Sequence, residues 1–458
     1  MEHKTYFIKT FGCQMNIRDS EIIAQSLEEH GYRQSKTIEG ASLIIINTCS
    51  VRAKAEQKLF SLLGALRKHK ANHPALQICV AGCVAQQEGQ MIIQRMPHVN
   101  LVVGTQHIYE LPSLLQRAAV MPTAVNLSDT YEIPRYVPRP VIDRHGDMSD
   151  QFARFVTIMQ GCNNFCTYCV VPYTRGREVS RKAFDIIDEV SILVAAGIGE
   201  ITLLGQNVNS YGTTNPVSED GAPYSFARLL REVSVIPGLR RLRFTTSNPK
   251  DLPDELISCF AEIDNLCPQL HLPVQSGSDA VLRLMNRKYR VADYLDKVDR
   301  LCGVRPDLAL TTDIIVGFPG ERDEDFQQTM DLLERVRYHG SFSFKYSDRP
   351  GTAAATFDGK CDEGVKSERL QIFQKRQDEI SLERNREYIG SIQEVLLEKV
   401  DSAEAFGRSP TNHIVHLESW PPQAQPGDIL RVSITSAGQH SMKGRAIDDQ
   451  ERGRKTDR

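Results

Sequence analysis

The chain has 458 residues, more than one ordinary domain holds, and this length predicts about two to four domains. Its 41% of hydrophobic and 25% of charged residues are typical of globular proteins, and no stretch approaches the roughly 20 apolar residues of a membrane helix. The net charge of −3 gives no overall basic signature of a nucleic-acid-binding protein. Because the N-terminus lacks the apolar segment of a signal peptide, we expect a cytoplasmic protein without a membrane partner.

The first segment, residues 1–125, alternates between strand and helix patterns. Helical periodicity falls at residues 17–30, 52–69 and 84–96, and short apolar runs predict strands at 6–10, 43–46, 77–81 and 101–103. Strands that alternate with helices predict an open, parallel α/β sheet. Residues 126–150 break the pattern with three prolines and predict a linker.

The second segment, residues 151–380, repeats a strand-then-helix unit. Its strands are predicted at 154–159, 201–204, 242–246, 270–272, 310–316 and 341–346. Six such units predict a partial (β/α)6 barrel, in which ligands collect at the C-terminal ends of the strands.

The third segment, residues 381–447, changes to a β pattern. Alternating residues predict strands at 392–400, 414–417 and 429–434, and glycines and prolines separate them. We expect a small all-β barrel here. The charged tail, residues 448–458, has a composition that predicts disorder.

Three of the eleven cysteines lie in one short loop, as Cys162, Cys166 and Cys169, directly after the first barrel strand. A [4Fe–4S] cluster normally takes four thiolates, so three leave one iron free to bind S-adenosylmethionine (SAM). Reduction of such a cluster splits SAM and releases a 5′-deoxyadenosyl radical, and Tyr168 places an aromatic ring where the adenine of SAM would lie. The alternative is a zinc site, which needs a fourth ligand nearby, and no histidine lies between residues 145 and 271.

Three further cysteines, Cys13, Cys49 and Cys83, each follow a predicted strand and precede a predicted helix. Such positions share one edge of a parallel sheet, so the three thiolates predict a second cluster with an open iron. The alternative is that buried cysteine acts as a small hydrophobe. That interpretation suits the remaining cysteines, which are Cys79, Cys259, Cys267, Cys302 and Cys361.

Glycine and amide residues follow the other barrel strands. Each loop is equally well a turn, but together they predict a cradle for SAM at one face of the barrel. The residues are Gly205, Gln206 and Asn207, then Ser247, then Gln275 and Ser276, then Ile315 and Gly317.

Basic residues gather in three places, and solvated helix faces explain each place taken alone. The groups are Arg175, Arg177, Arg181 and Lys182; Arg240, Arg241 and Arg243; and Arg283, Arg287, Lys288 and Arg290.

Several longer motifs carry a family resemblance. They read KTFGCQMN at residues 9–16, NTCSVR at 47–52, GCNNFCTYCVVPYTRG at 161–176, LGQNVN at 204–209 and HLPVQSGS at 271–278. In this order, and over nearly the whole chain, they resemble the radical-SAM methylthiotransferases. The resemblance implies an N-terminal methylthiotransferase domain at 1–125, a radical SAM barrel at 151–380 and a TRAM RNA-binding domain at 381–447.

The resemblance also implies the reaction. Cys13, Cys49 and Cys83 would hold an auxiliary [4Fe–4S] cluster, and the cysteines of the 162–169 loop would hold the radical-SAM cluster. One SAM would donate a methyl group to a sulfur on the auxiliary cluster, and a second would supply the radical that removes hydrogen from C2 of an adenine. The acceptor would be N6-dimethylallyladenosine beside the anticodon of tRNA.

The implied partners are tRNA and an electron donor, while the sulfur donor stays unidentified. We expect Arg175 and Arg177 near the barrel mouth, and Arg408 and Asn412 in the TRAM segment, to contact tRNA. Two positions depart from the family pattern. Asn248 stands where relatives often have histidine, and His413 stands where a basic arginine is more usual.

Two alternatives remain at this point. The acceptor could be another substrate of the same family, such as threonylcarbamoyladenosine in tRNA or an aspartate of a ribosomal protein, although residues 49–56 look more like the dimethylallyl-tRNA enzymes. A different class is a non-catalytic, zinc-containing RNA-binding protein, which would leave the two three-cysteine groups and the barrel repeat unexplained.

Overall fold

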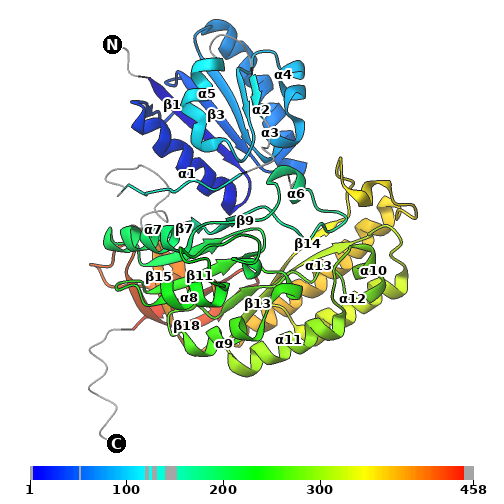
Figure 1. Cartoon of the computed structure of the whole chain (residues 1–458). Coiled ribbons are helices and arrows are strands. Elements are labelled where there is room, and N and C mark those ends of the chain that lie inside the picture. The colour runs from blue at the N-terminus through cyan, green and yellow to red at the C-terminus, as the bar shows by residue number, and fades with distance from the viewer. Residues whose placement is uncertain (1–3, 51–52, 119–122, 126–130, 140–151, 448–458) are drawn as a thin grey trace, which may run out of the picture.

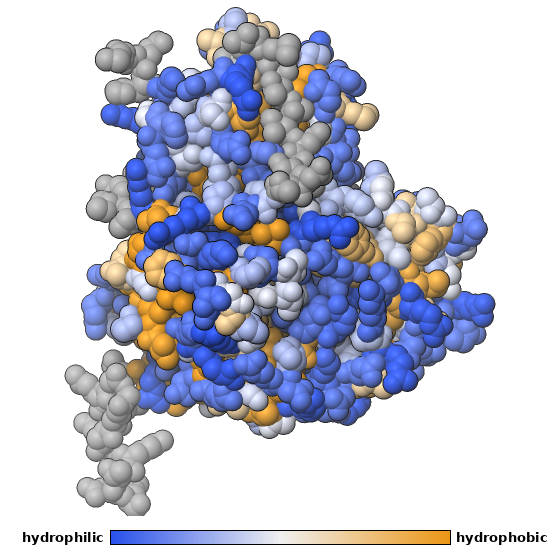
Figure 2. All heavy atoms as spheres, in the orientation of Figure 1, coloured by the Kyte–Doolittle hydropathy of each residue, from blue (hydrophilic) through white to orange (hydrophobic). Residues whose placement is uncertain are grey.

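The computed structural model describes residues 4–50, 53–118, 123–125, 131–139 and 152–447. An N-terminal α/β unit stands at the top of Figure 1, above a half-barrel of strands and helices, and a small C-terminal β-barrel packs against the half-barrel. Among the described residues, none of the helices has the length and apolar character needed to cross a membrane. Hydrophilic side chains cover most of the face shown in Figure 2.

The N-terminal unit is one parallel sheet between helices. Its strand order is β2-β1-β3-β4-β5-β6, and β3 is buried along its whole length, as a central parallel strand requires. The strands are β1 (Thr5–Phe11), β2 (Arg33–Gln34), β3 (Leu43–Thr48), β4 (Gln77–Gly82), β5 (Leu101–Val103) and β6 (Thr123–Val125). The helices are α1 (Gln14–Glu29), α2 (Ala53–Asn72), α3 (Cys83–Glu88), α4 (Gln90–Arg95), η1 (Ile108–Glu110) and α5 (Leu111–Ala118).

The single helix predicted at residues 84–96 is instead two short helices, α3 and α4. Gly89 separates them with a φ of +48°, a backbone conformation that glycine adopts without steric cost and that stops a helix. The apolar residues on both sides keep a helical spacing, which is why the periodicity alone missed the break.

The half-barrel is built from two three-stranded parallel sheets, β7-β10-β11 and β12-β13-β14. A backbone bridge between Leu242 and Leu266 joins the first sheet to the segment before β12. The strands of the half-barrel are β7 (Ala153–Thr157), β10 (Glu200–Leu204), β11 (Arg241–Thr245), β12 (Gln269–His271), β13 (Ala309–Val316) and β14 (Gly340–Lys345). A small separate pair is formed by β8 (Met159–Gln160) and β9 (Val179–Ser180). The helices are α6 (Val171–Thr174), α7 (Ala183–Ala195), η3 (Val208–Ser210), α8 (Phe226–Ser234), η4 (Pro249–Asp251), α9 (Asp254–Glu262), α10 (Asp279–Leu284), α11 (Val291–Val304), α12 (Asp323–Val336), η5 (Ala353–Thr356) and α13 (Glu363–Arg386).

The C-terminal unit is a closed barrel with strand order β15-β16-β17-β19-β18. Its strands are β15 (Ile392–Val400), β16 (Ala405–Arg408), β17 (Ile414–Ser419), β18 (Ile429–Ala437) and β19 (Ser441–Ala446). The predicted fold class is confirmed: an open parallel α/β unit, a partial six-stranded α/β barrel and a small all-β barrel. The strands β16 and β19 were not predicted, because their glycines and charged residues hide the alternation.

The predicted linker, tail and last segment boundary can be compared with the described elements. Residues 131–139 of the predicted linker carry no helix or strand, and the predicted disordered tail, 448–458, lies outside the described residues. The boundary predicted between residues 380 and 381 falls inside α13, which continues to Arg386.

Arginines in and next to β11 bind the C-terminal barrel to the half-barrel. The interpretation of these arginines as a solvated face is therefore wrong. Arg241 and Arg243 are buried, and the Arg243 Nε donates to Glu200 Oε1 at 2.9 Å. Together with Arg240 they donate to backbone carbonyls of the barrel, namely those of Glu394, Arg408, Ser409, Pro410 and Gly427. The joint thus rests on charge-assisted hydrogen bonds between units.

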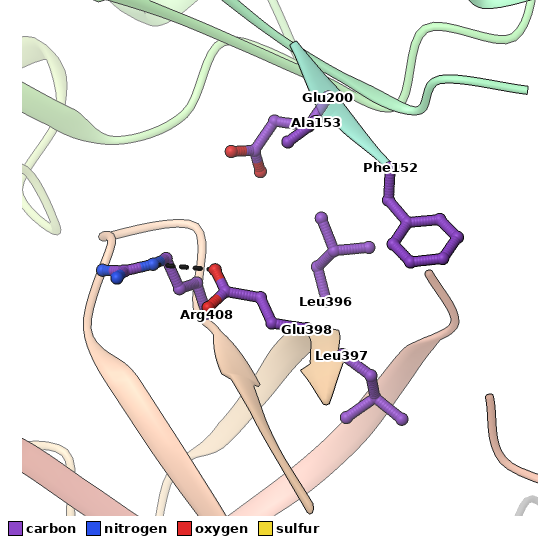
Figure 3. A pocket seen from close by; sticks show the side chains of 7 residues that line it. All are labelled: Phe152, Ala153, Glu200, Leu396, Leu397, Glu398 and Arg408. Carbon is purple, nitrogen blue, oxygen red and sulfur yellow. Dashed lines mark hydrogen bonds and ion pairs between the residues drawn. The ribbon is translucent and has the colours of Figure 1, made fainter. Parts of the chain in front are cut away.

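A small cavity lies in this joint (Figure 3). It is lined by Phe152, Ala153, Glu200, Leu396, Leu397, Glu398 and Arg408. Residues 152, 153 and 200 precede or begin barrel strands, so the cavity lies at the end of the half-barrel opposite the loops that follow those strands. Ligands of such barrels collect at the other end.

Candidate metal centres

Three cysteines meet at one edge of the N-terminal sheet, and we call them the N-terminal centre: Cys13, Cys49 and Cys83. They follow β1, β3 and β4, which are adjacent parallel strands. The register pairs Phe11 with Thr48 and Thr48 with Gly82, so all three chains leave the sheet at the same level. The predicted convergence of these cysteines therefore follows from the observed topology.

Two asparagines and two glycines hold these loops together. Asn16 Nδ2 donates to Asn47 Oδ1 at 3.1 Å, and Asn47 Nδ2 donates back to the Asn16 carbonyl at 2.9 Å. Asn16 Oδ1 also accepts the Cys13 backbone N–H at 3.3 Å. A Cβ on Gly12 would overlap Asn16 and Cys49, and a Cβ on Gly82 would overlap the Asn47 amide oxygen. Sequence reasoning missed both asparagines, although each lies within three residues of a cysteine in the quoted motifs.

The thiols of the N-terminal centre interact. A hydrogen bond with Cys49 lowers the pKa of Cys13 to about 6, against the effect of burial and with help from the nearby Arg175 guanidinium. Burial raises the pKa of Cys83, and Arg175 opposes that rise. One thiol is thus poised to ionise, and the group as a whole can ligate a cation.

Cys162, Cys166 and Cys169 lie in one loop after β8, and we call them the loop centre. Burial raises the pKa of Cys162 to about 11 and that of Cys169 to about 12, and Cys166 adds to both shifts because a nearby thiolate disfavours a second one. Cationic iron would supply the charge that makes three thiolates stable together.

The segment after α10 braces this loop. Asn286 Nδ2 donates to the Phe165 carbonyl at 3.0 Å, and the Thr167 N–H donates to the Met285 carbonyl at 3.1 Å. Arg287 is buried, and its Nη1 lies 3.6 Å from Cys166 Sγ. The interpretation of Arg287 as part of a solvated face is therefore wrong. The charged sequence around Arg287 is typical of a surface turn, but its partner Cys166 lies 121 residues away in the sequence.

Each centre offers three cysteine thiols, the donor set that the predicted cluster takes from the protein. Across the described part of the chain, no three His, Cys, Asp or Glu side chains are grouped as ligands of one metal ion. Both donor sets consist of three cysteines and match the predicted [4Fe–4S] chemistry.

Of the predicted SAM contacts that follow β10 and β11, Gln206 and Gly205 contact the chain directly before the loop centre. Gln206 Oε1 accepts the Gly161 N–H at 2.6 Å, one residue before Cys162. Asn207 Nδ2 donates to Asp251 Oδ2 at 2.7 Å, and Gly205 packs so closely on Met159 that a Cβ would overlap it. Ser247 is buried, and its hydroxyl has no hydrogen-bond partner among the described residues.

The remaining predicted SAM contacts are Tyr168 in the cysteine loop and the residues after β12 and β13, and they divide into two groups. Tyr168 and Ile315 belong to one apolar cluster beside the loop centre, and Gln275 follows β12 with a φ of +76°. Ser276 instead packs toward Thr329 of α12, and the Gly317 N–H donates to Glu321 at 2.9 Å. These last two residues hold the loop backbone in its conformation.

The four predicted tRNA contacts differ in exposure. Arg177 is exposed, with its guanidinium 5.3 Å from the centre of the Phe165 ring. Arg408 is partly exposed and pairs with Glu398 at 2.8 Å, and the exposed Asn412 lies beside it. Arg175, by contrast, is 3% exposed at its side chain and pairs with Asp19 at 2.6 Å. A buried and paired guanidinium is not open to a phosphate, so the structure places Arg175 beside the N-terminal centre instead.

Comparison with known proteins gives two family matches. Residues 5–104 match the model of uncharacterized protein family UPF0004, and residues 156–333 match that of the radical SAM superfamily. The first match spans the N-terminal centre, and the second spans the loop centre.

Two full-length relatives share the name tRNA-2-methylthio-N(6)-dimethylallyladenosine synthase. The protein of Desulfotalea psychrophila is 59% identical over 98% of this chain and 100% of its own length. That of Geobacter metallireducens is 47% identical over 96% of this chain and 98% of its own.

Two solved structures resemble this chain in fold, at low sequence identity. The radical SAM methyltransferase TsrM from Kitasatospora setae, with tryptophan and a SAM analog bound, gives a TM-score of 0.55 at 14% identity and covers 77% of this chain and 75% of its own. The cobalamin-dependent radical SAM enzyme OxsB gives 0.51 at 11% identity, over 83% of this chain and 62% of its own.

Proposed function

The chain belongs to the family of tRNA-2-methylthio-N6-dimethylallyladenosine synthases, and from this premise we propose which of its residues carry out the reaction. It is a radical SAM enzyme that converts N6-dimethylallyladenosine in tRNA to the 2-methylthio derivative. It uses two [4Fe–4S] clusters and SAM. The observation that carries the proposal is the presence of two separate three-cysteine centres, one at the ends of the parallel strands β1, β3 and β4 and the other in the loop that follows β7 and β8.

The N-terminal centre holds the auxiliary cluster, and the loop centre holds the cluster that binds SAM. When bound, these groups supply the sulfur, the methyl group and the one-electron chemistry of the reaction. The protein side chains position them. Gln206 and Asn286 fix the backbone of the cysteine loop from two sides through hydrogen bonds to Gly161 and Phe165.

SAM would be held by the loops that follow the barrel strands. The Ser247 hydroxyl, buried without a partner among the described residues, supports a hydrogen bond to a polar group of SAM, because an unsatisfied buried hydroxyl is costly. Tyr168 and Ile315 supply an apolar wall for the adenine. The substrate adenosine must leave its stack to reach this place, and proximity to the reacting carbon then supplies much of the rate.

Exposed residues on two units support tRNA binding. Arg177 lies next to the cysteine loop, while Arg408 and Asn412 lie on the C-terminal barrel, a fold that binds RNA through polar loops. The proposed domains are 1–125, 151–380 and 381–447, and helix α13 runs across the last of these boundaries to Arg386. The protein acts in the cytoplasm, without a membrane, and an electron-donor protein reduces the clusters.

Mass spectrometry of nucleosides from anaerobic reactions tests the function. The purified, cluster-loaded enzyme is given tRNA with or without the dimethylallyl group. A pocket for this group gains about 0.8 kcal/mol per buried methylene, so the prenylated tRNA should be methylthiolated and the bare tRNA hardly at all. Modification of a ribosomal-protein aspartate, with prenylated tRNA left unchanged, would contradict the substrate assignment.

A further inference from the structure

One buried guanidinium lies beside the N-terminal centre, on the chain segment that follows the loop centre. Arg175 lies six residues after Cys169 and caps the short helix α6. Its Nη2 donates to Asp19 Oδ2 of α1 at 2.6 Å, across the boundary between the half-barrel and the N-terminal unit. Its Nη1 is also buried, and among the described residues it has no hydrogen-bond partner.

The backbone around Arg175 is held against the N-terminal unit. The Thr105 hydroxyl donates to the Thr174 carbonyl at 2.7 Å, and a Cβ on Gly176 would lie 2.9 Å from the Gln106 amide nitrogen. Figure 1 shows α6 between the two units. The helix packs on α3, whose first residue is Cys83. The position of the guanidinium is therefore set from both sides.

The neighbours of the guanidinium are sulfur atoms and one carboxylate. Cys83 and Cys13 both interact electrostatically with Arg175, Cys83 also forms a side-chain hydrogen bond with it, and Asp19 supplies the counter-charge. Asp19 itself is 3% exposed and also faces Arg18. Burying a charged pair is costly, and leaving one of its nitrogens without an acceptor adds to that cost. A negatively charged sulfur at the N-terminal centre would accept from this nitrogen and remove the added cost.

We propose that the Arg175 guanidinium donates a hydrogen bond to a sulfur of the auxiliary cluster and thereby makes this cluster easier to reduce. The proposal rests on the assignment of Cys13, Cys49 and Cys83 as its ligands. Net charge and hydrogen bonds to the sulfurs set the potential of such clusters. A fixed positive charge stabilises the more negative, reduced state, and the carboxylate of Asp19 moderates that effect.

Arg287 provides a matched control at the other centre. It too is buried, and its Nη1 lies 3.6 Å from Cys166 Sγ. Its remaining nitrogens donate to the Tyr289 hydroxyl at 2.9 Å and the Pro273 carbonyl at 2.7 Å, all within the half-barrel. Loss of its charge should leave the auxiliary cluster unaffected.

The test is a redox titration followed by electron paramagnetic resonance. It uses the full chain with Cys162, Cys166 and Cys169 replaced by alanine, so that only the auxiliary cluster gives a signal. Into this parent we place Arg175→Met, Arg175→Lys, Asp19→Asn and, as control, Arg287→Met. Iron content is measured for each protein.

We expect Arg175→Met to lower the midpoint potential, Asp19→Asn to raise it, and Arg175→Lys to fall between the parent and the Met variant. Arg287→Met should leave it unchanged. An unchanged potential in an iron-loaded Arg175→Met protein, or a shift in the same direction in Arg175→Met and Asp19→Asn, would overturn the inference. If the Arg175→Met protein does not retain iron, the same test is made with the other two variants: Arg175→Lys should lower the midpoint potential and Asp19→Asn should raise it. If the parent itself holds no iron, the assignment of the auxiliary cluster to Cys13, Cys49 and Cys83 is wrong, and this result is distinct from a failure of the Arg175 inference.

Discussion

The two cysteine centres are built in opposite ways. The loop centre takes its three ligands from eight consecutive residues, whereas the N-terminal centre takes one ligand from each of three strand ends. A short loop can be braced by one neighbouring segment, here residues 284–289. The N-terminal centre instead needs the register of β1, β3 and β4, together with the Asn16–Asn47 pair, before its thiols meet. Its geometry is therefore more sensitive to remote changes in the fold.

The largest effect should separate the centres by iron content. Replacement of Cys162, Cys166 and Cys169 by alanine should leave about half of the iron, and so should replacement of Cys13, Cys49 and Cys83, because each set holds one cluster. Iron and acid-labile sulfide analysis after anaerobic loading measures this, with circular dichroism to check folding. Full iron in either folded variant would contradict the assignment of one cluster to each centre.

A glycine substitution tests the remote sensitivity of the N-terminal centre. In Gly82→Ala the new Cβ meets Asn47, at a φ of +92° that alone costs about 1–3 kcal/mol. We expect loss of auxiliary-cluster iron and a lower denaturant midpoint. Gly31→Ala is the control, since Gly31 has a similar φ of +83° but nothing within 4 Å of its Cβ, so it should keep its iron. Equal iron in the two variants would show that packing on Asn47 does not matter.

The joint with the C-terminal barrel should affect neither centre. Arg243→Met leaves Glu200 buried without one of its partners and removes donors to two barrel carbonyls, a change of about 3–5 kcal/mol for a buried pair. Limited proteolysis should release the C-terminal barrel faster, while iron content stays constant. Arg231→Met, which removes exposed ion pairs worth about 0–1 kcal/mol, is the control and should change little. Loss of iron in folded Arg243→Met would contradict the separation of this joint from the metal centres.

The smallest effect concerns tRNA. Arg177→Gln should weaken tRNA binding modestly and reduce the slope of log affinity against log salt by about 1, because one phosphate contact is lost. Filter binding over a range of salt concentrations measures the slope. Arg228→Gln, on the exposed face of α8, is the control. The same slope in Arg177→Gln and the unchanged protein would exclude this contact.

The sequence predicted the parts whose signal is local. The cysteine loop is a single motif, and the strand run at 43–46 is buried and wholly apolar. It failed where a residue's partner lies far along the chain. Arg175, Arg241, Arg243 and Arg287 all look like surface residues, yet each pairs with a group more than 100 residues away. Charge alone does not reveal whether an arginine is solvated or buried, because that depends on how the units dock.

The most direct test of two centres with separate tasks is 5′-deoxyadenosine formation by the Cys13, Cys49 and Cys83→Ala variant, with prenylated tRNA present. SAM cleavage needs only the loop centre, so the folded variant should still form 5′-deoxyadenosine but make no methylthio product. A folded variant that methylthiolates tRNA, or that no longer cleaves SAM while its loop-centre iron remains, would contradict the account.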